Sequence, residues 1–141
     1  MGKHSMFEQI SLAAGISLVV GARAVPAATA DPLAPHRWKD RVVVIIAPDG
    51  SDPSLHEQRA AFAAARNGLK ERDIVVLEAA DNGSEATALR RKFAGPGHAF
   101  RAVLVGKDGG AKLTSDRPIS AERLFGEIDA MPMRRQEMRE R

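Results

Sequence analysis

Residues 41–47 read Arg-Val-Val-Val-Ile-Ile-Ala, a continuous β-branched run that decides the fold class. Such a run predicts a strand buried on both faces, as in the centre of an α/β sheet. A turn at residues 49–51 follows it. Asp52 then predicts a helix N-cap and Pro53 the first helical position, because these residue types favour those places. The segment therefore predicts a central strand that leads directly into a helix.

Periodicity and turn residues predict the elements that follow. Leu55, Phe62 and Leu69 recur every seven residues and form the apolar stripe of a helix over residues 53–70. Residues 107–110, Lys-Asp-Gly-Gly, predict a tight hairpin turn, since Asp-Gly tolerates positive φ angles. The other predicted elements are a strand at 74–78, a short helix capped by Ser84, strands at 100–106 and 111–115, and a last helix capped by Ser120 with Ala121, Leu124, Ile128 and Met131 on its inner face.

The order of these elements is β-α-β-α-β-β-α. Right-handed crossovers predict that the first three strands are largely parallel, while the hairpin adds an antiparallel edge. This pattern predicts a thioredoxin-like three-layer α/β fold, in which a central mixed sheet of about four strands is flanked by helices.

Composition excludes several functions. The 141 residues contain 21 Lys and Arg against 18 Asp and Glu, and no cysteine. Disulfides, thiolate metal sites, thiol nucleophiles and cysteine-linked lipid anchors are therefore excluded. The net charge of +3 is small and only 4% of residues are aromatic, so we expect no nucleic-acid partner.

The first thirty residues predict a signal peptide. A polar start is followed by an apolar run at residues 10–21 and by small residues up to Ala30. Cleavage is expected after Ala30, with the Ala22-Arg23-Ala24 site as the second choice and an uncleaved N-terminal helix as the alternative. Met6 stands where myristoylation requires Ser or Thr, so no stable membrane anchor is expected.

The chain is therefore predicted to be periplasmic or secreted as one domain over residues 31–141. Mass spectrometry of exported material should give an intact mass that corresponds to a first residue at Asp31.

Two segments resemble redox proteins of the thioredoxin clan. Ser51-Asp52-Pro53-Ser54 stands at the strand-to-helix turn, where thioredoxins carry Cys-x-x-Cys. Arg101 matches by position the arginine that enters a strand beside the peroxidatic cysteine of peroxiredoxins. The peroxiredoxin signature Pro-x-x-x-(Thr/Ser)-x-x-Cys is one residue longer than the segment from Pro48 to Ser54, which also lacks the thiol.

Four further segments extend the resemblance over residues 38–138: 38–42, 71–73, 105–113 and 128–135. Together they resemble a bacterial domain-of-unknown-function family of the thioredoxin-like, peroxiredoxin-related clan, which is related to the DRO-URB-DRS-Equarin-SRPUL domains. The resemblance implies a thioredoxin-like fold and export, and it carries no assigned activity.

Ser51, Ser54 and Arg101 are the candidate residues of a vestigial pocket for an anion or another ligand. The alternative is that Arg101 is structural and pairs with Asp49 or Asp52. Catalysis by Ser51, Asp52 and His56 is not expected, because Asp52 is needed as a cap and nothing makes the three converge.

No metal, cofactor or phosphate loop is expected. His36, His56 and His98 lie in three segments without ligand spacing, and the glycine-containing loop at residues 106–110 leads into a strand. The tail at 133–141 is predicted to be a solvated, basic helical end with a Glu137–Arg141 pair; a handle for acidic partners is the alternative.

These observations predict a non-catalytic, exported thioredoxin-like module that binds an unknown protein or small molecule. The alternative is a divergent oxidoreductase-related or accessory protein that uses the cysteine-less pocket.

Overall fold

The structure, a computed structural model, describes residues 30–141, and the folded domain spans Pro32–Arg141. The predicted signal peptide lies outside the described residues, apart from Ala30. The elements in chain order are η1 (Ala34–His36), β1 (Arg41–Ile46), α2 (Pro53–Ala64), α3 (Arg66–Glu71), β2 (Ile74–Ala79), α4 (Ser84–Phe93), η2 (Pro96–His98), β3 (Arg101–Val105), β4 (Ala111–Ser115), α5 (Ala121–Asp129) and α6 (Pro132–Arg139). Among the described residues, no helix is long and apolar enough to cross a bilayer.

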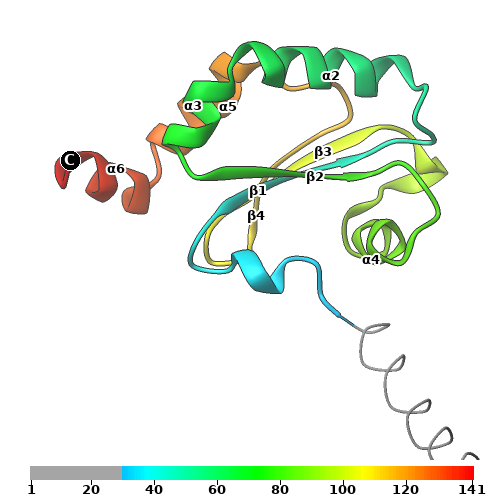
Figure 1. The fold of residues 1–141 in the computed structure, drawn as a ribbon, viewed down its shortest axis with the longest axis horizontal. Helices are drawn as coiled ribbons and strands as arrows, with labels where there is room; N and C mark the ends of the chain where they lie inside the picture. Colours follow the sequence, from blue (N-terminus) through cyan, green and yellow to red (C-terminus); the bar gives the residue numbers. More distant parts are fainter. Residues whose placement is uncertain (1–29) are drawn as a thin grey trace, which may run out of the picture. The chain divides into compact units, whose positions relative to one another are not determined.

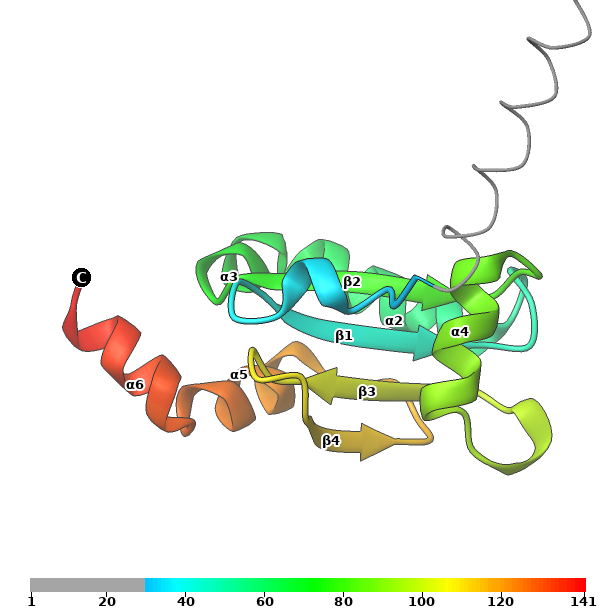
Figure 2. The ribbon, with the colours of Figure 1, turned by 90° about the horizontal axis from the view of Figure 1, so that it is seen from below.

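The four strands form one mixed sheet in the order β2-β1-β3-β4 (Figure 1). β1 and β2 are parallel, β1 and β3 are antiparallel, and β3 and β4 form the predicted hairpin. The prediction that β3 is largely parallel to β1 is therefore wrong. Ala79 at the end of β2 and Arg101 at the start of β3 both pair with Ile46, so the connection through α4 stays at one end of the sheet (Figure 2).

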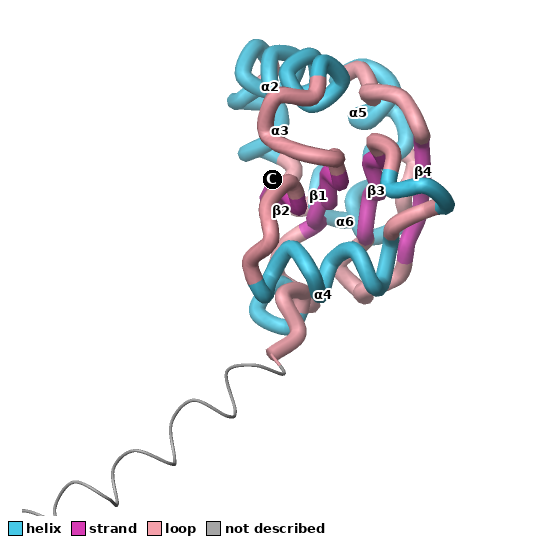
Figure 3. Tube along the Cα trace, turned by 90° about the vertical axis from the view of Figure 1, so that its right-hand side faces the viewer, coloured by secondary structure: helices cyan, strands magenta, loops and turns pink. Residues whose placement is uncertain are grey.

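Helices cover both faces of the sheet, which gives the three layers (Figure 3). The alternation of side chains along β1 explains this arrangement, since successive residues point to opposite faces. Val43 and Ile45 pack with residues of α2, α3 and α5, whereas Val42 and Val44 pack with residues of α4 and the segment before η1. A strand with two apolar faces therefore requires cover on both sides.

The helix boundaries follow local chemistry. The Asp52 carboxylate accepts a hydrogen bond from Leu55 N at 3.1 Å, and the Ser120 hydroxyl accepts one from Arg123 N at 3.1 Å, so both predicted caps are confirmed. The predicted cap at Ser84 is wrong by one position, because Gly83 is the N-cap and Ser84 is the first residue of the helix.

Two predicted helices are each divided in the structure. The helix expected over residues 53–70 is interrupted at Ala65, between α2 and α3. The last helix stops at Asp129, and Pro132 begins α6. Proline is well suited to a helix start but cannot continue a helix without losing a backbone hydrogen bond.

A buried amide fixes α2 to the segment that leads into α5. The Gln58 side chain is fully buried. Its Nε2 donates to Ile119 O at 2.8 Å, and its Oε1 accepts from Ile119 N at 2.8 Å. Gln58 therefore supplies both partners that the buried backbone groups of Ile119 need.

Candidate functional site

The strand-to-helix turn uses its polar side chains internally. Ser51 donates to Asp49 Oδ1 from its backbone N at 2.8 Å and from its hydroxyl at 2.7 Å. These hydrogen bonds hold the pKa of Asp49 below its usual value. Asp52 caps α2, and Ser54 lies half-buried in the first turn of that helix. The turn is exposed at Ser51 and is organised as a helix start.

Arg101 pairs with neither aspartate of that turn. Its Nε donates to Asp116 Oδ1 at 3.2 Å and its Nη1 to Phe93 O at 3.4 Å, so the expected pairing with Asp49 or Asp52 is wrong. The guanidinium lies so close to Gly95 that a side chain there would collide with it. A small pocket of about 230 Å³ is lined by Gly95, Pro96, Ala99, Phe100, Arg101 and Asp116. Neither Ser51 nor Ser54 is among these residues.

Two of the described histidine side chains have separate surroundings. His36 Nδ1 lies 2.8 Å from Asp40 Oδ2, while His56 lies exposed on α2. Within residues 30–141, no group of three or more His, Asp or Glu side chains could hold a metal ion.

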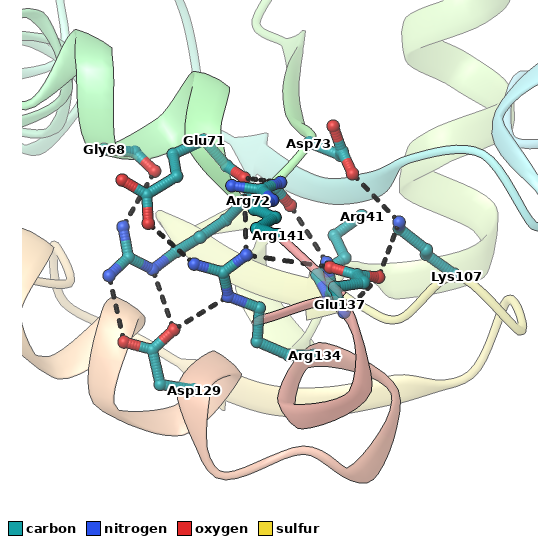
Figure 4. A network of polar contacts seen from close by, with 10 residues as sticks. All are labelled: Arg41, Gly68, Glu71, Arg72, Asp73, Lys107, Asp129, Arg134, Glu137 and Arg141. Carbon is teal, nitrogen blue, oxygen red and sulfur yellow. Dashed lines mark hydrogen bonds and ion pairs between the residues drawn. The ribbon is translucent and has the colours of Figure 1, made fainter. Parts of the chain in front are cut away.

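A dense polar network occupies the opposite end of the sheet, where β1 begins and β3 ends (Figure 4). Its central member is Arg41, whose side chain is only 1% exposed. Arg41 Nη1 donates to Arg72 O at 3.0 Å, and its two terminal nitrogens donate to the carboxylate of Glu137 at 3.2 Å each. Arg41 thus connects the central strand to the loop before β2 and to α6.

Lys107 supplies the second cation for Glu137. Lys107 Nζ lies 2.8 Å from Glu137 Oε2 and 3.0 Å from Asp73 Oδ2. Burial raises the pKa of Glu137, but the hydrogen bonds from Lys107 and Arg41 outweigh this effect, so the pKa lies below its usual value. Glu137 is therefore ionised and shared between two cations at neutral pH.

Arg134 forms the second half of the network. It is 1% exposed and contacts Asp129 at 3.1 Å and Glu71 at 2.7 Å. Asp129 also receives two hydrogen bonds from Arg72, at 3.0 and 2.9 Å. The Arg72 hydrogen bonds lower the pKa of Asp129 against the opposing effect of burial, and Arg134 lowers it further. Carboxylates from α3 and α5 thus hold this one arginine of α6.

These contacts correct the prediction for the C-terminal tail. Arg134 is buried, and Glu137 pairs with Arg41 and Lys107. Arg141 donates to Glu71 O at 2.9 Å, instead of pairing with Glu137. The physical reason is that the side chains of Arg134 and Glu137 reach charged groups of α3, α5, β1 and the β3–β4 turn, which require partners.

A pocket opens beside this network. It has a volume of about 360 Å³ and is lined by Arg41, Gly106, Lys107, Asp108, Lys112, Met131, Pro132 and Met133. It therefore lies between the start of β1, the β3–β4 turn and the N-terminus of α6. Arg41 Nε is buried and has no hydrogen-bond partner, and no other buried side-chain nitrogen or oxygen in the described part of the chain lacks one.

The sequence contained a signal for this end of the molecule. Arg41 opens a run predicted to be buried on both faces, and a charged residue in such a place requires a charged partner. The four segments that carry the family resemblance also meet here, because they contain Arg41, Glu71, Arg72, Lys107 and Arg134. The partners of each charge could not be assigned without the topology.

The fold is that of thioredoxin-like proteins, and the strand-to-helix turn of this chain carries Ser51 and Ser54 and no cysteine. A crystal structure of reduced 2-Cys peroxiredoxin from Plasmodium vivax has a TM-score of 0.52 and 14% sequence identity, over 75% of this chain and 84% of that one. At this identity, the similarity shows the fold alone.

The chain belongs to the family described as Domain of unknown function (DUF4174), whose model matches residues 32–137. No curated protein matches the chain.

Removal of the buried arginine of α6 should destabilise the domain. Arg134→Ala leaves Glu71 and Asp129 without a shared cation, and we expect this loss of ion pairs to lower the free energy of unfolding by about 2 kcal/mol. The effect is no larger because both carboxylates can regain some water. Urea denaturation measures this loss. Arg135→Ala, at the exposed neighbouring position, is the matched control and should change stability by less than about 0.5 kcal/mol. Equal effects of the two substitutions would contradict the described role of Arg134.

The network should also make stability depend on pH. The pKa values of Glu137 and Asp129 are lower in the folded chain than in the unfolded one, so their contribution is complete above the unfolded values of about 4 and is lost as pH falls below them. Urea midpoints between about pH 6 and pH 3 should therefore decrease toward acid, and the decrease should be smaller for Glu137→Gln. An unchanged acid dependence in that variant would show that Glu137 does not contribute to it.

Proposed function

We propose that this protein is an exported, non-catalytic thioredoxin-like module that works by binding. The observation that carries this proposal is the contrast between the two ends of the sheet. At one end, the turn from Asp49 to Ser54 is organised as a helix start, without a thiol. At the other end, a pocket lies against the buried charges of Arg41 and Lys107.

The chemistry of the turn argues against a redox role. Thioredoxin-type exchange needs a thiolate, which the helix N-terminus stabilises by lowering the pKa of the sulfur. The hydroxyl of Ser51 is a much weaker acid, forms no disulfide and already donates to Asp49. The sequence supplies no cysteine at any other position.

The geometry of the opposite end favours binding. Pockets of about 300 Å³ or more with apolar walls and a few fixed polar groups are typical of small-molecule sites. Here Glu137 and Arg72 O fix the guanidinium of Arg41, and Glu137 and Asp73 fix the ammonium of Lys107. Charged groups that are held in place bind a ligand with less loss of side-chain entropy.

Export is supported by sequence features. The pattern of the first thirty residues is typical of a signal peptide. The chain also resembles a bacterial family that is related to the DRO-URB-DRS-Equarin-SRPUL domains, which occur in extracellular proteins. A periplasmic or secreted location therefore belongs to the proposal.

A turnover assay tests the non-catalytic role. The protein should consume no hydrogen peroxide and reduce no insulin disulfides above the buffer rate, because it supplies no thiol. Arg101→Ala is the companion variant. Turnover by the native chain would overturn the proposal, and turnover that is lost in Arg101→Ala would favour the alternative, an oxidoreductase-related role of the segment with Ser51, Ser54 and Arg101.

A further inference from the structure

The pocket beside the α6 N-terminus has the features of a site for a specific class of ligand. Its lining contains three cationic side chains, Arg41, Lys107 and Lys112, and one carboxylate, Asp108. Asp108 Oδ2 lies 2.9 Å from Lys112 Nζ, while Arg41 and Lys107 share Glu137. Lys107 also pairs with Asp73, so three carboxylates balance the three cations. An ammonium has three N–H donors, and these pairs use two on Lys107 and one on Lys112, so the remaining donors suit an anion of low charge.

Arg41 carries hydrogen-bonding capacity that the protein does not use. The side chain is 1% exposed and lines the pocket, and its Nε is buried without an acceptor. Buried donors in folded proteins are nearly always paired, so an unpaired one requires an explanation. A ligand oxygen at this end of the pocket would supply the missing acceptor.

The start of α6 adds to the preference for an anion. Met131, Pro132 and Met133 form one wall of the pocket and are the N-cap and first two positions of this eight-residue helix. No side chain caps the helix. Met131 N donates to Ile128 O and Pro132 has no N–H, so Met133 and Arg134 supply the N–H groups that, with the helix dipole, make this terminus positive. A carboxylate placed here would meet both the side-chain cations and the helix terminus.

The same wall is apolar. Met131, Pro132 and Met133 all line the pocket, and Met133 is 40% exposed. Methionine is flexible and adapts to ligands of different shape. An apolar wall beside a cationic floor suits a ligand with an apolar part and an anionic head.

We infer that this pocket binds a small molecule that joins one carboxylate to a short apolar chain. Arg41, Lys107 and Lys112 meet the carboxylate, and Met131 and Met133 cover the chain. This inference rests on the proposed binding role and names its ligand class.

Isothermal titration calorimetry of the full chain with octanoate tests the inference. We expect saturable binding of one octanoate per chain. Octan-1-ol, which lacks the charge, and acetate, which lacks the chain, should bind at least about tenfold more weakly, because each loses one half of the recognition.

Paired variants locate the site. Lys112→Met and Met133→Gln should each weaken octanoate binding at least about fivefold, since each removes one part of the lining. Lys70→Met and Met138→Gln are the matched controls, because both residues are exposed and neither lines the pocket. Met138 is 41% exposed, close to the value for Met133. The two methionine variants therefore change side chains of similar exposure, one inside the pocket and one outside it.

The outcomes separate this inference from the proposed function. Failure of octanoate to bind, equal binding of octan-1-ol, or equal losses in the control variants would overturn the ligand class. Peroxide or insulin turnover would overturn the proposed function, whatever octanoate does.

Discussion

The charge of Arg41 places a strong constraint on this fold, because it is buried at the first position of the central strand. A guanidinium removed from water is costly unless carboxylates and carbonyl groups surround it. The chain meets this requirement with Glu137, 96 residues further on, and with Arg72 O from the loop before β2. Lys107 then shares Glu137, and Arg134 binds Glu71 and Asp129. Arg134 is the only residue of α6 that is fully buried, so ion pairs, more than apolar packing, hold this helix on the domain.

Local signals predicted much of the fold. The apolar run at residues 42–47, the caps at Asp52 and Ser120, and the Asp-Gly turn are each encoded within a few residues, and the structure contains them. The direction of β3 was not predictable in this way, because it depends on how α4 crosses the end of the sheet. The polar network was missed for the same reason. Arg41 signalled that a buried partner was needed, but only the topology brings Glu137 to it.

The two ends of the sheet differ in role: the polar groups of one end are used within the fold, and the other end holds the proposed binding site. At the end with Ser51 and Arg101, the polar groups bond to one another or to the backbone. The other end combines fixed cations, an unpaired donor on Arg41, an uncapped helix start and an apolar wall around one pocket. We therefore propose that binding takes place at the end of the sheet beside the start of α6, away from the turn at Ser51.

Mapping of octanoate binding by amide chemical shifts in ¹H–¹⁵N spectra tests this claim most directly. The account predicts that the amides of Lys107, Lys112 and Met133 shift along a single saturable curve, while those of Ser51, Ser54 and Arg101 stay in place. Saturable shifts centred on Ser51, Ser54 and Arg101, with Lys107 and Met133 unchanged, would contradict it and would place binding at the turn that redox proteins use.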